Sequence, residues 1–249
     1  MRIASVGHAV FAVTMVALGI LGLINGDFAP IWLPVPKGVP AHEALVYLCD
    51  FVSIACGVGL FWRSASALAA RVLFVYLFVW MLLFKVRFIL LAPTVEVSYE
   101  SCGETAVIVA GVWVLYVWFA TAWERRRLSL ITGDKGLRFA RVLFGLALIA
   151  FGLSHFFYLK ETVTLVPAWL PSPVFWAYLT GGAYIAAGVA VIIHVYAQLA
   201  AELTALQMGL FTLLVWAPII ASGHISSSQW VEFVVSWTMT AAAWVVADS

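Results

Sequence analysis

The sequence predicts an all-α, polytopic membrane protein. Of its 249 residues, 65% are hydrophobic and 10% are charged, whereas a soluble domain is about half apolar and about a quarter charged. Long apolar runs follow one another along the chain, and a spanning helix needs only about 20 such residues. Short polar or proline-rich segments separate the runs, so eight spans fit in the chain. The net charge of +1 gives no reason to expect a nucleic-acid partner.

The ends of the spans follow from breaker residues. The first span ends at Asn25-Gly26-Asp27, and the third stops at Pro93 because proline cannot continue a helix. One arginine precedes the first run, as in a signal peptide, but no small-residue cleavage site follows it, so we interpret the run as a retained first helix. The expected spans are 7–25, 42–62, 65–91, 102–123, 139–159, 173–194, 197–221 and 229–247.

The connections also have distinct compositions. A loop with four prolines, Pro30 to Pro40, follows the first span, and Pro167, Pro171 and Pro173 stiffen the connection after the fifth. A loop with Glu96 and Glu100 is expected before the fourth span. The most polar stretch, ERRRLSLITGDKGLR, forms a basic linker at 124–138.

The positive charges predict the orientation. With the N-terminus in the cytoplasm, nine of the thirteen lysines and arginines fall on the cytoplasmic side. The other four, Lys37, Lys85, Arg87 and Lys160, fall toward the outside. This bias places both termini in the cytoplasm of a multi-pass cell-membrane protein.

The chain also repeats itself. LGLINGDFAPIWLP at 21–34 matches FGLSHFFYLKETVTLVPAWLP at 151–171, which aligns Asn25 with His155. Later matches align Gly57 with Gly188 and Glu104 with Glu232. Four spans per copy give both copies the same orientation, so we expect two parallel four-helix bundles side by side. The expected units are a first repeat at 1–123, the linker at 124–138 and a second repeat at 139–249.

The second repeat resembles a known family. The run RVLFGLALIAFGLSHFFYLKETVTLVPAWLPSPVFWAYLTGGAYIAAGVAV, from Arg141 to Val191, is similar to the DoxX-like family of four-helix membrane proteins. The resemblance implies a tandem fusion of two such units. Because the family includes the small membrane subunit of an archaeal thiosulfate:quinone oxidoreductase, it also implies a redox-enzyme partner. Many members carry an acidic residue near the position of Tyr184, and here Asp50 of the first repeat lies at similar depth.

Ionisable residues inside apolar helices indicate a candidate ligand-binding site. Such residues are rare in membrane spans and usually face the bundle interior. We expect Asp50, Lys85, Arg87 and Glu104 to converge on a cavity open to the outside, with Asn25 or His155 at its wall. In the alternative interpretation, Lys85 and Arg87 extend to the outer headgroups and Asp50 pairs with one of them.

Three further residues carry their own alternatives. Glu104 and Glu232 both precede the last apolar run of their repeat, and a glutamate at a helix N-terminus is also favoured by the helix dipole alone. His155 stands alone in an apolar helix, where a histidine commonly serves as a structural hydrogen-bonding group. We therefore include Glu232 and His155 with the other four candidate residues, without a catalytic role.

The residues leave three classes of function open. The first is the membrane subunit of a redox system that acts near a quinone-like, lipid-soluble molecule, and the second is a binder or transporter of a small solute. The second class is weakened because no helix is broken by Gly or Pro at the midplane of both halves. The third is a scaffold for a soluble partner. The spacing of the five histidines does not require haem, and the three cysteines form no metal-ligand pattern.

Overall fold

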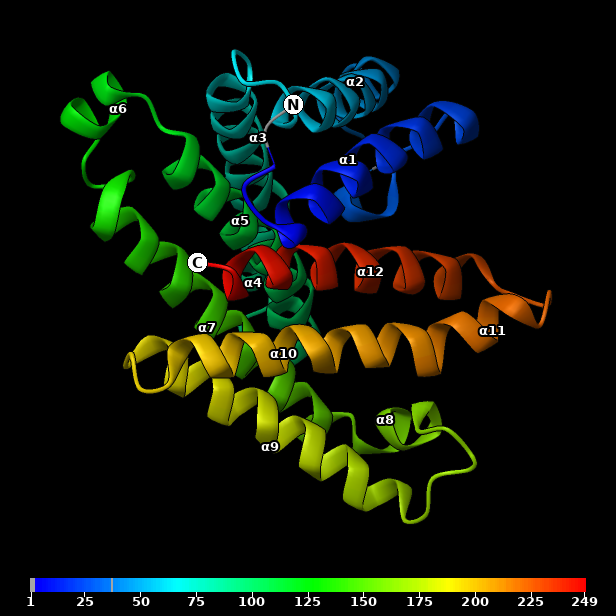
Figure 1. Cartoon of the computed structure of the whole chain (residues 1–249). Helices are drawn as coiled ribbons and strands as arrows, with labels where there is room; N and C mark the ends of the chain where they lie inside the picture. Colours follow the sequence, from blue (N-terminus) through cyan, green and yellow to red (C-terminus); the bar gives the residue numbers. More distant parts are fainter. Residues whose placement is uncertain (1–2, 37) are drawn as a thin grey trace.

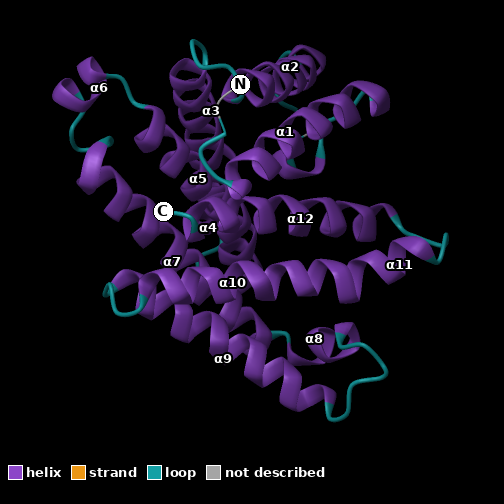
Figure 2. Ribbon diagram, in the orientation of Figure 1, coloured by secondary structure: helices purple, strands orange, loops and turns teal. Residues whose placement is uncertain are grey.

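Helices are the only regular secondary structure over the residues that the structure describes. In this computed structural model, residues 3–36 and 38–249 are described, and eight of their helices are long and apolar enough to cross a membrane (Figures 1 and 2). The predicted fold class, an all-α polytopic membrane protein, is confirmed. Arg2 and Lys37, which contribute to the charge bias, lie outside the described residues.

Six of the spans are single helices and two contain a wider π turn. The single helices are α1 (Val6–Asn25), α2 (His42–Leu60), α5 (Glu96–Phe119), α7 (Gly133–Phe157), α9 (Pro173–Ile192) and α12 (Ser227–Ala247). The third span runs through α3 (Ser66–Trp80), the π segment η2 (Met81–Val86) and α4 (Arg87–Leu91). The seventh runs through α10 (Ala197–Phe211), the π segment η3 (Thr212–Trp216) and α11 (Ala217–Ala221). Three short helices lie in connections: η1 (Pro30–Trp32), α6 (Ala122–Arg127) and α8 (Leu159–Leu165).

The fourth span differs from its expected limits at both ends. Helix α5 begins at Glu96, so the expected loop of Glu96 and Glu100 is helical. An acidic residue in the first turn is favoured by the helix dipole, which a count of apolar residues does not register. The helix ends at Phe119 because Thr121 starts α6 with a capping box, in which Thr121 and Glu124 satisfy each other's backbone N–H groups. Part of the expected linker is therefore helical.

The two halves of the chain interlock. The central helices α5 and α12 pack against each other; α5 also packs against α3 and α7, and α12 against α10 and α1 (Figure 1). The last span of each half therefore contacts the first span of the other half. Two separate bundles side by side would not show these contacts, so that part of the expectation is wrong, whereas the division into two repeats stays a prediction.

Glycines bring the helices of two pairs into close contact. A Cβ added to Gly57 of α2 would lie 2.8 Å from the Ala12 carbonyl oxygen of α1. A Cβ added to Gly188 of α9 would lie 2.5 Å from the Gly145 carbonyl oxygen of α7. In a membrane, where lipid tails are as apolar as leucine, such close backbone packing is a main source of helix association.

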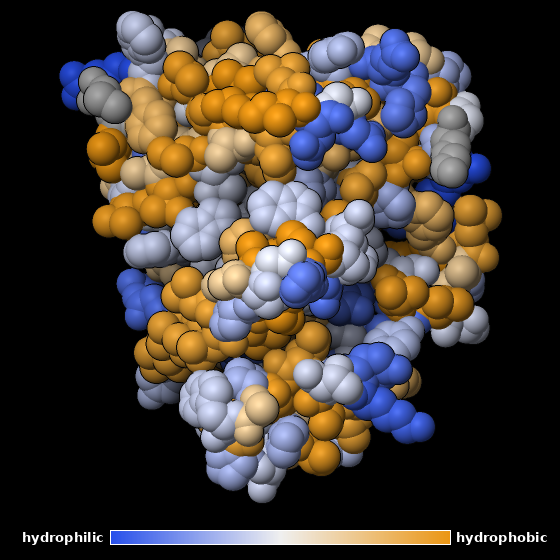
Figure 3. Space-filling view, turned by 90° about the vertical axis from the view of Figure 1, so that its right-hand side faces the viewer, coloured by the Kyte–Doolittle hydropathy of each residue, from blue (hydrophilic) through white to orange (hydrophobic). Residues whose placement is uncertain are grey.

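The surface carries many large hydrophobic side chains. Phe51 is 71% exposed and Leu90 is 76% exposed, although both lie within predicted spans. Hydrophobic residues cover broad areas of the face in Figure 3, and hydrophilic residues gather in smaller patches. Exposed apolar areas of this extent indicate contact with lipid rather than with water.

The topology leads to a direct prediction. Helix α7 begins directly after Thr132, and its Arg141 hydrogen-bonds Ser249, just beyond the C-terminal end of α12, whereas Ser228 lies at the opposite end of α12. We expect reporter fusions at Thr132 to indicate the cytoplasm and fusions at Ser228 to indicate the outside. Alkaline phosphatase and green fluorescent protein fusions measure this. Finding both positions on one side would contradict the orientation.

Candidate functional site

A lysine lies buried inside the membrane-spanning region. Lys85 of η2 is 2% exposed, and its Nζ donates hydrogen bonds to the Leu33 carbonyl oxygen at 2.6 Å and to Ser101 Oγ at 2.9 Å. It therefore joins the connection after η1 to the central helix α5. The alternative interpretation, in which Lys85 extends to the headgroups, does not hold, because its ammonium group is enclosed by protein.

The π turn explains how Lys85 comes to face the interior. Leu73, Leu77, Met81 and Lys85 follow at intervals of four residues, and all are buried. In a regular α-helix each such step rotates the side chain by about 40° around the axis. The wider turn from Met81 to Val86 offsets this rotation, so the row stays on one face. Such π turns occur frequently at functional sites.

Two carboxylates, one from each half of the chain, lie near Lys85, but beyond 4.0 Å from its ammonium group. Glu104 of α5 and Glu232 of α12 both lie close enough to interact electrostatically with Lys85, and Glu104 also interacts with Glu100. Glu104 and Glu100 are half-buried, and Glu232 is exposed. We call Lys85, Glu100, Glu104 and Glu232 the lysine–glutamate cluster. The structure thus brings together three of the predicted site residues, and adds Glu100, which we expected in a loop.

The helix dipole does not account for the two aligned glutamates. Because α5 begins at Glu96, Glu104 lies about two turns inside the helix, and Glu232 lies beyond the first turn of α12. The effect of the dipole fades within the first turn. Their positions are better explained by their shared proximity to Lys85.

An aromatic cluster adjoins Lys85. Trp80 donates a hydrogen bond from Nε1 to the Trp32 carbonyl oxygen at 3.0 Å, and its ring lies 4.4 Å from that of Phe84 and 5.2 Å from that of Trp32. The Trp32 ring also contacts Tyr76. Trp32 is fully buried, yet its own Nε1 has no hydrogen-bond partner in the part of the chain that the structure describes. Buried N–H groups without a partner are rare, so this donor needs an explanation.

The two proline-rich connections differ in how far their tryptophans are buried. Trp32 is 0% exposed and its segment η1 packs against α12, whereas Trp169, its counterpart in the second connection, is 69% exposed. The repeated WLP motif therefore predicts a similar sequence position but not a similar environment. Only the first connection contributes to the site.

Asp50 and Arg87 do not join the cluster. Among the described residues, Asp50 forms no ion pair with Lys85 or Arg87, and the only ion pair joins Arg71 to Glu124. Asp50 is instead packed between α2 and α1, against Gly22. Arg87 is exposed on α4. The expected convergence is therefore wrong for these two residues, because the helix interface, and not depth alone, decides which side chains meet.

His155 also lies elsewhere than expected. It packs against Gly181 of α9, and its ring contacts Tyr184 at 5.6 Å. Its Nδ1 is hydrogen-bonded to the Phe151 carbonyl oxygen at 2.7 Å. These contacts fit the structural hydrogen-bonding alternative for His155.

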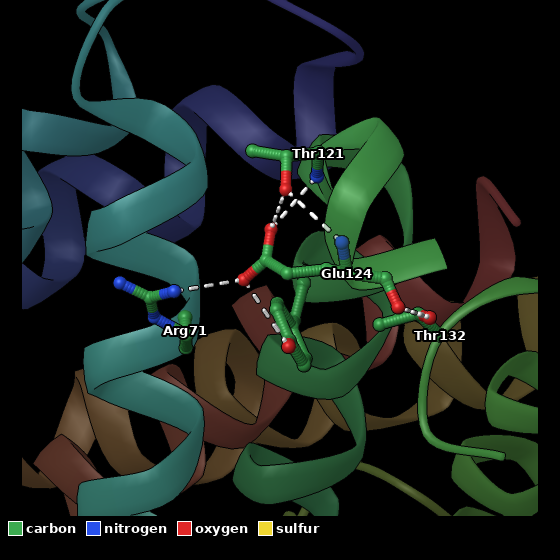
Figure 4. A network of polar contacts seen from close by, with 5 residues as sticks. Arg71, Thr121, Glu124 and Thr132 are labelled. Atoms are coloured by element: carbon green, nitrogen blue, oxygen red, sulfur yellow. Dashed lines mark hydrogen bonds and ion pairs between the residues drawn. The ribbon is translucent and has the colours of Figure 1, made fainter. Parts of the chain in front are cut away.

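A second polar network lies beyond the C-terminal end of α5 (Figure 4). Glu124 of α6 is 1% exposed and accepts hydrogen bonds from Thr121, from Tyr116 and from Arg71, the last at 3.1 Å. Burial by itself would raise the pKa of Glu124, but the hydrogen bonds from Thr121 and the Arg71 guanidinium outweigh it and hold the pKa below its ordinary range. This network fastens the linker to α3 and leaves no acceptor for a ligand.

Replacing Glu124 by glutamine should lower the stability by about 1–3 kcal/mol at neutral pH, since Arg71 and Thr121 lose their charged partner. The pKa is lower in the folded than in the unfolded chain, so the carboxylate's contribution is present above the ordinary pKa of glutamate and disappears as the pH falls through the folded value. Thermal unfolding in detergent at several pH values measures this. Glu202→Gln, at an exposed position of α10, is the control. A difference that persists in acid would contradict the role of the charge.

Other parts of the described structure are weaker candidates for a functional site. Nowhere in residues 3–36 and 38–249 do three or more His, Cys, Asp or Glu side chains gather as metal ligands. One surface hollow is lined by Tyr196, Gln198 and Glu202, and another by Asp134, Arg138, Arg141 and His194. Neither touches the lysine–glutamate cluster. The predicted open cavity is thus not among these hollows.

Fold and site together define a multi-pass integral membrane protein in which carboxylates of both halves lie near a buried lysine. Comparison of the chain with protein-family models, with characterised proteins and with solved structures finds no match. Any more particular function therefore has to be argued from the site itself.

Proposed function

We propose that the chain is the membrane subunit or partner of a redox system and that it binds a quinone-like ring between the lysine–glutamate cluster and the aromatic cluster. The observation that carries the proposal is the buried Trp32 Nε1, which has no partner and lies among aromatic rings beside Lys85. A ring carbonyl oxygen would accept this hydrogen bond, and the rings of Trp80 and Phe84 would form an apolar wall. Ligand sites of this kind combine aromatic walls with a few polar groups.

The charged groups supply what such a ligand requires. The Lys85 ammonium can donate a hydrogen bond to a second carbonyl oxygen. The carboxyl groups of Glu100, Glu104 and Glu232 outnumber the single buried cation, so the cluster can take up and release protons. A quinone, when bound, would contribute the electron transfer. An ionisable cluster in a membrane span is by itself a reason to expect function, since its burial is costly.

The resemblance of residues 141–191 to the DoxX-like family belongs to this proposal. It supplies the redox partner, because small membrane subunits of that family accompany redox enzymes. The site, however, is built mostly from the first half of the chain, together with Glu232 of α12. We therefore place the ligand in the first half and assign the second half mainly to the scaffold.

Equilibrium dialysis of a short-chain ubiquinone analogue against the protein in nanodiscs tests the proposal. We expect saturable binding that Trp32→Phe weakens about five- to tenfold, the value of one hydrogen bond. Trp123→Phe, at a 59% exposed position on α6, is the matched control and should bind normally. Absence of saturable binding, or equal binding by Trp32→Phe and the wild type, would contradict the proposal.

A second candidate is a carrier of a small solute. The observation that favours it is the pair of π turns, Met81–Val86 and Thr212–Trp216, which interrupt the third and seventh spans at corresponding depths. Irregular helices in both halves of a membrane protein are typical of transporters. Charge movement in proteoliposomes after addition of small organic acids or bases would support this function over quinone binding.

A further inference from the structure

Asp50 is a fully buried carboxyl group without a partner. It is 0% exposed, and within residues 3–36 and 38–249 neither of its side-chain oxygens has a hydrogen-bond partner. Its side chain lies against Gly22 of α1, where an added Cβ would overlap the carboxyl group. Glu124 offers a direct contrast, because it is equally buried but accepts hydrogen bonds from several donors. Burial alone therefore does not leave a carboxyl group of this protein without partners.

The surrounding helices supply no counter-charge. The only ionisable side chain of α1 is His8, far along the helix from Gly22. Helix α3 contributes Tyr76, whose hydroxyl group is hydrogen-bonded to Cys49 at 3.3 Å, and Arg71, which is paired with Glu124. Helix α2 itself adds Tyr47, Cys49 and Cys56 near this level, and none of them is a cation. An isolated carboxylate in such a setting is so costly that the group takes up a proton instead.

We propose that Asp50 is a proton-binding site within the membrane, neutral while α1 and α2 are packed together and able to release its proton when the two helices separate. The site is distinct from the lysine–glutamate cluster, and it does not depend on the ligand proposed there. The proton is bound by one carboxyl oxygen and leaves to water or to a neighbouring acceptor, so no other reactant is needed.

The packing of the second half provides a comparison. Gly19 lies against the Asp50 carbonyl oxygen and Ile54, and Gly152 lies in the same way against the Gly181 carbonyl oxygen and Ile185. By this packing, Asp50 corresponds to Gly181 and Gly22 corresponds to His155. The sequence repeat aligned Asn25, and not Gly22, with His155. Each helix pair thus holds one ionisable side chain opposite one glycine, on opposite helices. Both helix pairs, α1–α2 and α7–α9, therefore have a position for a protonatable side chain between their helices.

Infrared spectroscopy distinguishes the two protonation states directly, because the C=O stretch of a carboxylic acid is well separated from the bands of a carboxylate. In the full-length protein in lipid at neutral pH, we expect the difference spectrum between wild type and Asp50→Asn to show one carboxylic-acid band. The difference between wild type and Glu124→Gln should show carboxylate bands instead. A carboxylate signal lost in Asp50→Asn would overturn the proposal.

Stability provides a second readout. In the folded chain Asp50 holds a proton that the unfolded chain releases, so the free energy of unfolding should fall as the pH rises, until the folded carboxyl also ionises. Asp50→Asn should remove this part of the pH dependence of the unfolding temperature. If Asp50→Asn does not fold, the wild-type protein with carbon-13-labelled aspartate serves instead, because the label shifts the bands of aspartate side chains and leaves those of the glutamates in place. Absence of an isotope-shifted carboxylic-acid band at neutral pH would overturn the proposal.

Discussion

Replacing Lys85 by methionine is expected to destabilise the protein by about 3 kcal/mol or more. The substitution removes the cation that faces Glu104 and Glu232, and it leaves the Leu33 carbonyl oxygen without its donor. Because Lys85 is 2% exposed, the Leu33 carbonyl oxygen and the Ser101 hydroxyl group each lose a hydrogen bond to a charged donor in a buried setting, which costs about 1.5–3 kcal/mol for each bond. Thermal unfolding in detergent, followed by tryptophan fluorescence, measures the loss.

Two variants separate the charge from the loss of packing. Arg87→Met, at the exposed first residue of α4, should change the stability by no more than about 0.5 kcal/mol. Adding Glu104→Gln to Lys85→Met should recover part of the lost stability, since the number of unpaired carboxylates falls. If both methionine variants lose equal stability, or if the double variant is no better than the single one, the cluster is not held by its charges.

Gly188→Ala is expected to destabilise the α7–α9 pair by about 1–3 kcal/mol. Its Cβ would lie 2.5 Å from the Gly145 carbonyl oxygen, and backbone cannot move aside as a flexible side chain can. The comparison is Gly182→Ala on the same helix, where an added Cβ meets nothing within 4 Å. That variant should gain up to about 1 kcal/mol, since alanine favours the helix more than glycine does.

Gly188→Ala is expected to lower the stability and Gly182→Ala to raise it, and this difference in direction makes the test specific. The measurement is again thermal unfolding in detergent, with binding of the quinone analogue as a check that the site remains intact. Equal effects of Gly188→Ala and Gly182→Ala would show that the close approach of α7 and α9 contributes nothing to stability.

The sequence predicts the spans well because a membrane requires long apolar helices, and that requirement is visible in a single chain. The sequence did not predict that α5 begins at Glu96, because the first turns of this helix are polar and lie outside any apolar run. The sequence repeat also aligns Gly57 with Gly188. Their role as contact points became evident only from the packing.

The sequence predicts which types of residue form the site, but not which of the candidate residues come together. Lys85, Glu104 and Glu232 stand out as charges in or beside apolar runs, and these three do come together. Asp50 stands out equally, yet it lies in a different helix interface. Which charges meet depends on the π turn that orients Lys85 and on the crossing of α5 with α12, and neither has a clear mark in the sequence.

The contact between the first and last spans constrains how the protein is made. Thr14 of α1 accepts a hydrogen bond from Trp237 of α12, and the Gly7 N–H donates one to Asp248. During synthesis α1 enters the membrane first, while its partner surface is still untranslated. Until the final helix emerges from the ribosome, this face of α1 must be shielded by lipid or by the insertion machinery. Any stop in translation before α12 would therefore leave α1 with an uncovered polar hydroxyl, a feature that quality-control proteases of the membrane can recognise.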